Sequence, residues 1–176
     1  RIPIGVGGSK ALGLGIPIPK TYFDQYEMTS QFEGAERIAE KYGISRLETD
    51  ALGLESQLRA ARAIAEGRFN AQMIPVEAPI LDEDGKRTDK TRTVTTDEIP
   101  RKTSLEALAG LKPVARENGV HTAGSSSQIA DGAAAVLLMS GERARELGLK
   151  PLARIVETAL VGCDPVLMLE GPIPAT

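Results

Sequence analysis

The 176-residue sequence has few of the side chains that build metal sites, disulfides or aromatic cores. It contains no Trp, three Phe, three Tyr, one Cys (Cys163) and one His (His121). A single cysteine excludes a disulfide within the chain, and one Cys with one His is too small a ligand set for a typical zinc site. We therefore expect no metal, a core of aliphatic side chains and, from the lone cysteine, a reducing cytoplasmic location.

A strong charge of one sign and a long apolar run are also missing. The formal net charge is -3, which gives no support for a nucleic-acid-binding surface. No stretch approaches the roughly 18 consecutive apolar residues that a membrane-spanning helix needs. The hydrophobic fraction of 41% and the charged fraction of 26% are ordinary for a globular protein. We therefore expect neither nucleic acid nor a membrane as a partner.

Neither end of the sequence has the pattern of a natural terminus. The chain begins at Arg1 without an initiator Met, and it ends in the Pro-rich stretch 171–176, whose composition usually introduces a helix. We expect a piece of a longer protein. Within it, residues 1–20 are rich in Gly and Pro, which predicts an arm or loop in place of a regular helix.

Two helices are predicted in the stretch that follows. Ser30 with Glu33 has the spacing of a capping box and opens a helix that Gly43 ends. Ser45 with Glu48 repeats the box before a long amphipathic helix that ends near Gly67. The apolar face of this second helix is expected at Leu47, Ala51, Leu54, Leu58, Ala61 and Ala65.

A hairpin and a short helix come next. Residues 73–76 and 91–96 read as extended segments around the polar turn 82–85. The charges of this stretch indicate a solvated hairpin, with a dedicated anion site as the alternative. A short helix is predicted from Ser104 to a point before Pro113.

The last third has the pattern of an α/β layer. A small, hydroxyl-rich turn at 123–127 precedes the apolar run 133–139, which suits a strand buried on both faces. A short helix over 141–147 and a second buried strand over 152–161 follow. Strand, helix and strand in that order predict an α/β core beside a helix-rich lobe.

Three stretches in register resemble the thiolase family. The clearest is Thr122-Ala-Gly-Ser-Ser-Ser-Gln-Ile-Ala-Asp-Gly-Ala-Ala-Ala135, which is similar to the family's Thr-Ala-Gly-Asn-x-Ser-x-x-Asn-Asp-Gly-Ala segment. Further resemblance lies in Pro151-Leu-Ala-Arg-Ile155, Gly162-Cys-Asp-Pro165 and Gly171-Pro-Ile-Pro-Ala175, and more weakly in 36–46. The resemblance runs along nearly the whole chain.

The resemblance implies a fold and an assembly. The fold class would be α/β, a partial thiolase-like layered α/β/α core with an inserted helix-rich loop domain. Residues 1–20 would form a Gly/Pro-rich arm, 21–118 the loop domain and 119–176 part of the core, crossing from the N-terminal to the C-terminal half. The arm would help subunits assemble, so the intact protein is expected to be a homodimer or homotetramer.

The resemblance also implies acyl transfer between coenzyme A and 3-oxoacyl-coenzyme A, by thiolysis or Claisen condensation. Thiolases use a nucleophilic Cys, a His that activates it and a second Cys as acid and base. All three are expected outside this sequence, so we assign no catalytic residue and expect the piece alone to be inactive. His121 and Cys163 do not occupy the catalytic positions, and a lone Cys is usually a small hydrophobe.

What the resemblance leaves in this chain is recognition of coenzyme A as co-substrate. Ser127 matches the position whose hydroxyl lies beside the pantetheine arm, and Ser126 and Gly124 would shape the same wall; a turn-stabilising Ser is the alternative. Arg101 matches an Arg near the nucleotide end, where a guanidinium suits phosphate and adenine. A match shifted by one residue would give this role to Lys102 instead, which is the alternative.

Two departures from the family pattern and two further candidates complete this interpretation. The family's Asn is Ser125 here, and the position where some members place a Ser against the coenzyme is Ala107. Met28 and Phe32 are candidates for the acyl tunnel, with helix core as the alternative for Phe32. The rival functions are a non-catalytic relative that binds coenzyme A or lipid, and a purely structural α/β domain.

Overall fold

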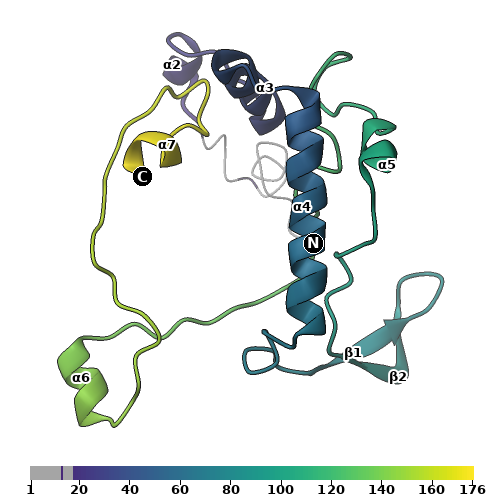
Figure 1. Cartoon of the computed structure of the whole chain (residues 1–176), viewed down its shortest axis with the longest axis vertical. Helices are drawn as coiled ribbons and strands as arrows, with labels where there is room; N and C mark the ends of the chain where they lie inside the picture. Colours follow the sequence, from purple (N-terminus) through teal and green to yellow (C-terminus); the bar gives the residue numbers. More distant parts are fainter. Residues whose placement is uncertain (1–12, 14–17) are drawn as a thin grey trace. The chain divides into compact units, whose positions relative to one another are not determined.

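The computed structural model describes residue 13 and residues 18–176, which divide into two compact units. The first unit joins the described residues up to Gly43 with Val136–Thr176, and the second unit is Ile44–Ala135. Figure 1 traces the chain through both units, and each is described by itself. The arm predicted at 1–20 lies mostly outside the described residues, and the predicted domain boundaries stay a prediction.

The first unit begins with two helices, α2 (Lys20–Phe23) and α3 (Gln31–Tyr42). Ser30 caps α3 by accepting a hydrogen bond from the Glu33 N–H at 3.1 Å, as its spacing predicts. The helix ends where Gly43 turns left-handed with φ 65°, a conformation that costs glycine little. The predicted helix and both of its ends are confirmed.

The same unit is held together by contacts between α3 and a segment near the end of the chain. The Thr29 hydroxyl donates to the Val166 carbonyl at 2.6 Å. Lys41 forms an ion pair with Glu170 at 2.6 Å, and this buried carboxylate also accepts from the Tyr42 hydroxyl at 3.1 Å. The hydrogen bond to Glu170 raises the pKa of Lys41. A short helix, α7 (Pro172–Ala175), follows directly.

The second unit is built on the helix α4 (Arg46–Ala65). Its start is a complete capping box, in which the Glu48 N–H donates to the Ser45 hydroxyl and the Glu48 carboxylate accepts from the Ser45 N–H. The carboxylate accepts hydrogen bonds from the Ser45 N–H and from the Ser45 hydroxyl, and these two bonds lower the pKa of Glu48. The helix ends at Ala65 and Gly67 follows with φ 66°, so the predicted helix is confirmed.

The side of α4 that is buried differs from the side that its apolar residues predicted. Leu47 is 67% exposed and Leu58 is 56% exposed. The buried residues of the helix are Thr49, Asp50, Gly53 and Ala63. The buried side differs because backbone segments of this unit pack directly against α4. Small or hydrogen-bonding side chains leave room for a backbone at that distance, whereas leucine side chains would not.

A hairpin and a short helix complete the second unit. Strands β1 (Val76–Leu81) and β2 (Arg87–Val94) pair antiparallel in the register Val76 to Val94, around a turn with Gly85 at φ 74°. The hairpin is mostly exposed, as predicted, although its strands lie nearer the turn than expected. Helix α5 (Leu105–Ala109), capped by Ser104, packs on α4 and buries Leu108.

The two strands predicted in the last third are not formed in the described chain. The hairpin is the one sheet among the described residues, and 133–139 and 152–161 pair with nothing in it. Leu137 is 76% exposed and Leu160 is fully exposed. The prediction is wrong for this chain because a strand needs hydrogen-bonded neighbours on its edges. Between the two segments the predicted short helix forms as α6 (Gly141–Glu146), and the structure shows that Ser140 caps it.

One further property concerns the helices as a set. Among residues 18–176, the helices are all too short or too polar to cross a membrane.

Candidate coenzyme-binding site

The turn at 122–127 is organised around Thr122, whose side chain is completely buried. The Thr122 hydroxyl accepts a hydrogen bond from the Gly124 N–H at 3.0 Å, and the Thr122 carbonyl accepts from the Ser125 N–H at 3.1 Å. On its other side, Thr122 forms an isolated antiparallel bridge with Pro113. The turn is therefore fixed by its own first residue and by the segment that follows α5.

The three serines of this turn have different surroundings. The Ser125 hydroxyl accepts from the Thr122 N–H at 3.0 Å, and the Ser126 hydroxyl donates to the Thr122 carbonyl at 2.7 Å. Ser127 is exposed, and its hydroxyl makes only a 3.3 Å contact to the carbonyl of Gln128. Two hydroxyls thus hold the turn, and the third is free to bind a partner outside it.

Gly124 lies in the tightest part of the turn. A Cβ placed on it would overlap the side chain of Leu108 and would come within 3.2 Å of Leu111. A larger residue would require the Leu108 side chain to move. Ser126 and Gly124 therefore shape the backbone beside Ser127, whereas the Ser126 hydroxyl is already used within the turn.

Arg101 lies in the same unit as the turn and is anchored through its backbone. Its N–H donates to the side-chain oxygen of Gln57 on α4 at 2.8 Å. The guanidinium is exposed and its Nε–H reaches the carbonyl of Ile99 at 3.4 Å, so most of its donors face solvent. Lys102 is also exposed. Both cations predicted for the nucleotide end are available to a ligand.

The Arg46 side chain ties α5 to α4 beside the turn. Arg46 Nε donates to Asp50 Oδ2 at 2.8 Å, and the same guanidinium donates to the carbonyls of Leu108 at 2.7 Å and Leu111 at 3.0 Å. Asp50 is 2% exposed, and its Oδ1 atom has no hydrogen-bond partner. Arg46 therefore serves both as counter-ion of a buried carboxylate and as cap for the last carbonyls of α5.

His121 and Cys163 belong to different compact units. His121 is half-buried, and its carbonyl accepts from the Val114 N–H at 3.0 Å. Cys163 is exposed and its sulfur lies 4.0 Å from the Met168 carbonyl, an acceptor that does not activate a thiol. Within the described part of the chain, His, Cys, Asp and Glu side chains form no group of three or more that could hold a metal ion.

The other residues singled out in the sequence are placed as follows. Ala107 lies in α5 and donates its N–H to the Ser104 hydroxyl at 3.2 Å. Met28 and Phe32 belong to the first unit. Met28 precedes α3, Phe32 lies in the first turn of α3, and both side chains are exposed. Their predicted place in an acyl tunnel stays a prediction.

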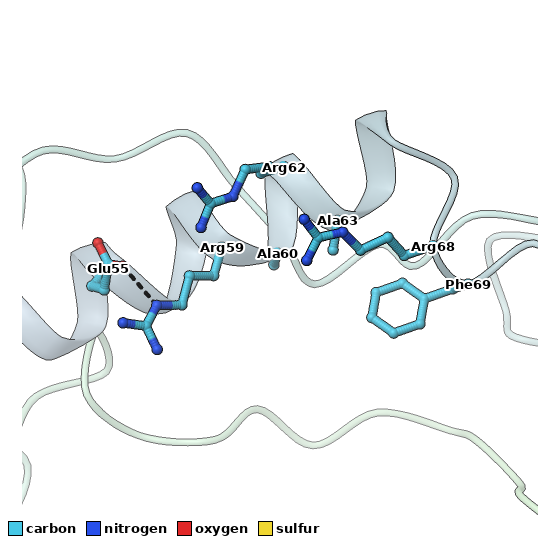
Figure 2. A pocket seen from close by; sticks show the side chains of 7 residues that line it. All are labelled: Glu55, Arg59, Ala60, Arg62, Ala63, Arg68 and Phe69. Carbon is cyan, nitrogen blue, oxygen red and sulfur yellow. Dashed lines mark hydrogen bonds and ion pairs between the residues drawn. The ribbon is translucent and has the colours of Figure 1, made fainter. Parts of the chain in front are cut away.

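A shallow hollow of about 450 Å³ lies along the last turns of α4 and the residues after it. Figure 2 shows three arginines beside it, with Arg59 paired to Glu55. Arg68 pairs with Glu66, and Arg62 also lines the hollow. None of the residues predicted to bind coenzyme A lines this hollow. Two of its three cations already have carboxylate partners, so the hollow adds no second site.

Sequence reasoning missed the residues of α4 that support the site. Thr49, Gly53 and Gln57 contact the segments that carry Ser127 and Arg101. In the sequence these three residues are recognisable only by their spacing. They are small or polar, they recur every four positions, and the apolar residues of the helix lie on another side. That signal indicates a close backbone approach but does not say which segment approaches.

Comparison with known proteins gives one consistent result. Residues 8–142 match the N-terminal domain of thiolase. The chain is 48% identical over 143 residues to the acetyl-CoA acetyltransferase of Pseudomonas aeruginosa, covering 81% of this chain and 35% of that protein. It is also 48% identical over 145 residues to the peroxisomal 3-ketoacyl-CoA thiolase B of Rattus norvegicus, covering 80% of this chain and 34% of that protein.

Solved structures agree with the sequence matches. The crystal structure of the Bacillus anthracis acetyl-CoA acetyltransferase superposes on 92% of this chain and 42% of its own, with a TM-score of 0.75 and 37% identity. The human mitochondrial 3-ketoacyl-CoA thiolase superposes on 81% of this chain and 34% of its own, with a TM-score of 0.69 and 41% identity. The chain spans about a third of the length of the curated relatives it matches. Over more than half of its length it matches the thiolase N-terminal domain, and it belongs to the thiolase family.

Proposed function

We propose that the intact protein is a thiolase that transfers an acyl group between coenzyme A and a 3-oxoacyl-coenzyme A. The reaction runs as thiolysis or, in reverse, as Claisen condensation. The observation that carries the proposal is the turn at 122–127, which lies inside the family match and leaves the Ser127 hydroxyl facing solvent. The relatives that match are acetyl-CoA acetyltransferases and 3-ketoacyl-CoA thiolases by name.

The chemistry assigns the covalent step to residues outside this sequence. In thiolysis a cysteine thiolate attacks the 3-oxo carbon, the bond between C2 and C3 breaks, and C2 takes a proton as acetyl-coenzyme A leaves. The thiolate of a second coenzyme A then takes the acyl group from the cysteine, which regains its thiolate. The 176 residues supply part of the coenzyme site, so we expect the piece alone to be inactive.

The coenzyme contacts follow from the two exposed groups of the second unit. The Ser127 hydroxyl hydrogen-bonds an amide of the pantetheine arm, and the backbone around Gly124 and Ser126 forms the wall beside it. The Arg101 guanidinium binds the nucleotide end through its phosphates or by stacking on adenine, with Lys102 as the alternative cation. Ser127 and Arg101 both lie in one compact unit, so in this proposal a single body recognises both ends of the coenzyme.

The test is a thiolysis assay on the intact protein with acetoacetyl-coenzyme A and longer 3-oxoacyl substrates. We expect turnover, and we expect Ser127→Ala to raise KM for coenzyme A by about twofold to tenfold, the worth of one hydrogen bond. Ser127→Thr keeps the hydroxyl and is the matched control. Arg101→Ala is expected to raise the same KM, and Arg101→Lys to restore part of the loss.

The alternatives predict different results in the same assay. A non-catalytic relative that binds coenzyme A or lipid would bind coenzyme A without turnover. A structural domain would show neither turnover nor any change in affinity on substitution of Ser127 or Arg101. Turnover that is insensitive to Ser127→Ala would leave the enzyme assignment standing and remove Ser127 from the coenzyme site.

Assembly and location complete the proposal. The family resemblance supports a homodimer or homotetramer of the intact protein, which light scattering on the purified protein would determine. The cytoplasmic location expected from the lone cysteine is also a proposal, because matching relatives are named as peroxisomal and mitochondrial. Fractionation of cells that produce the intact protein would test it.

A further inference from the structure

One side of α4 carries three contacts at regular spacing. Thr49, Gly53 and Gln57 are four residues apart, so they lie on one side of a helix with 3.6 residues per turn. Successive contacts are separated by about 6 Å along the axis. Their partners, in the same order, are Val120, Gly124 and Arg101.

The first contact holds the start of the serine turn. The Thr49 hydroxyl oxygen lies 2.7 Å from the carbonyl of Val120 and 2.8 Å from the carbonyl of Arg46, and its single proton is donated to one of the two. Val120 precedes Thr122, the buried residue that organises the turn, by two positions. Thr49 thereby ties the serine turn to the helix.

The second contact seats the turn directly on the helix. A Cβ on Gly53 would lie 2.5 Å from the carbonyl oxygen of Gly124, closer than real Cβ atoms approach a backbone. Glycine at this position lets the two backbones meet with no side chain between them. A displacement of α4 at Gly53 would therefore displace the turn at Gly124 as well.

The third contact holds Arg101. The side-chain oxygen of Gln57 accepts the Arg101 N–H at 2.8 Å, although the two residues are 44 positions apart. Residues 100–104 form no helix or strand, so this hydrogen bond supplies an anchor that secondary structure does not. The Arg101 guanidinium then extends from a fixed point on α4.

We propose that Thr49 and Gln57 are positioning residues for coenzyme A, each acting on a different part of the coenzyme. Gln57 sets the nucleotide end through Arg101, and Thr49 sets the pantetheine end through the turn that carries Ser127. Neither touches the ligand. The inference rests on the proposed function, because it takes Ser127 and Arg101 as the coenzyme contacts.

The experiment compares two thiols as acceptors in thiolysis of acetoacetyl-coenzyme A by the intact protein. Coenzyme A carries the nucleotide, and pantetheine presents the same thiol and amides without it. Gln57→Met, which keeps the length but removes the acceptor, is expected to raise KM for coenzyme A by about twofold to tenfold and to leave KM for pantetheine unchanged. Gln57→Glu keeps an acceptor oxygen and should restore KM.

The other positions supply the matched comparisons. Thr49→Val, which removes the hydroxyl at constant shape, is expected to raise KM for both thiols by the same factor, and Thr49→Ser to reverse the change. Ser56→Ala, at an exposed neighbour on the same helix, should change neither KM. If Gln57→Met does not fold, Gln57→Ala removes the same acceptor and carries the test.

Arg101→Ala tests the premise that Arg101 contacts the nucleotide, separately from the inference that Gln57 positions Arg101. A rise in KM for coenzyme A alone supports Arg101 as the nucleotide contact, and the Gln57 variants then decide the inference. An equal rise for both thiols in Gln57→Met, or no rise, overturns the role of Gln57 while Arg101 stands. If Arg101→Ala does not discriminate between the thiols, the nucleotide contact itself is wrong and the role of Gln57 falls with it.

Discussion

The turn at 122–127 and the apolar run at 133–139 are close neighbours in sequence, yet only the turn is held by hydrogen bonds in the described part of the chain. The turn closes its hydrogen bonds within five residues and rests on α4. The apolar run is more hydrophobic, but it is exposed and pairs with no strand among the described residues. Hydrogen-bond partners, more than hydrophobicity, decide which segment acquires structure here.

Amide hydrogen exchange on the 176-residue chain would test this comparison most directly. We expect amides of 133–139 and 152–161 to exchange near the rate of an unstructured peptide. Amides in the middle of α4 should exchange more slowly, by a factor on the order of a hundred, because their opening requires local unfolding. Equal protection in the two regions would show that the apolar segments find partners, and the comparison would fail.

Removing the counter-ion of Asp50 would weaken the helix platform beneath the turn. Arg46→Met leaves a carboxylate that is 2% exposed without its ion pair and uncaps the end of α5. We expect the free energy of unfolding to fall by about 3–5 kcal/mol, measured by urea denaturation. Adding Asp50→Ala to this variant removes the stranded charge and should recover part of the loss. A cost below about 0.5 kcal/mol would show that the pair adds nothing.

Substituting Thr122 would test the turn itself. Thr122→Val keeps the shape of a completely buried side chain and removes the acceptor of the Gly124 N–H. We expect a loss of about 1–3 kcal/mol in the free energy of unfolding, because the partly buried Gly124 N–H loses its acceptor. Thr122→Ser, which keeps the oxygen, should lose less. Equal losses in the two variants would assign the effect to packing instead of the hydrogen bond.

The smallest expected effect concerns the capping box at the start of α4. The pKa of Glu48 is lowered below its ordinary value of 4.5 by hydrogen bonds from Ser45, so its contribution to stability is present above that pH. The contribution is lost as the pH falls through the lowered pKa. Glu48→Gln should lower Tm by about two degrees at pH 7 and by less at pH 3. A pH-independent difference would remove the carboxylate from the cap.

Elements whose signals are local could be predicted from the sequence. Ser30, Ser45, Ser104 and Ser140 each cap a helix, and the hairpin forms around its predicted turn. Each of these elements is specified within a few residues. The strands over 133–139 and 152–161 were predicted wrongly because their partners are not in the described chain.

The site was predictable in part, for a similar reason. The family resemblance drew attention to Ser127 and Arg101, and their coenzyme contacts stay a prediction. It did not draw attention to Thr49 or Gln57, whose partners lie 71 and 44 positions away. The apolar pattern of α4 also favoured the wrong buried face, because a helix that supports backbone needs small residues where it is buried.

The contacts of the first unit have a consequence for the order of folding. Thr29 bonds to Val166 across 137 positions, and Lys41 pairs with Glu170 across 129. During synthesis, α4 and the turn it supports are made before Val166, because synthesis proceeds from the N-terminus. The unit Ile44–Ala135 has all of its residues while α3 still waits for its partner. The unit Ile44–Ala135 can therefore begin to fold while the other unit still lacks part of its chain.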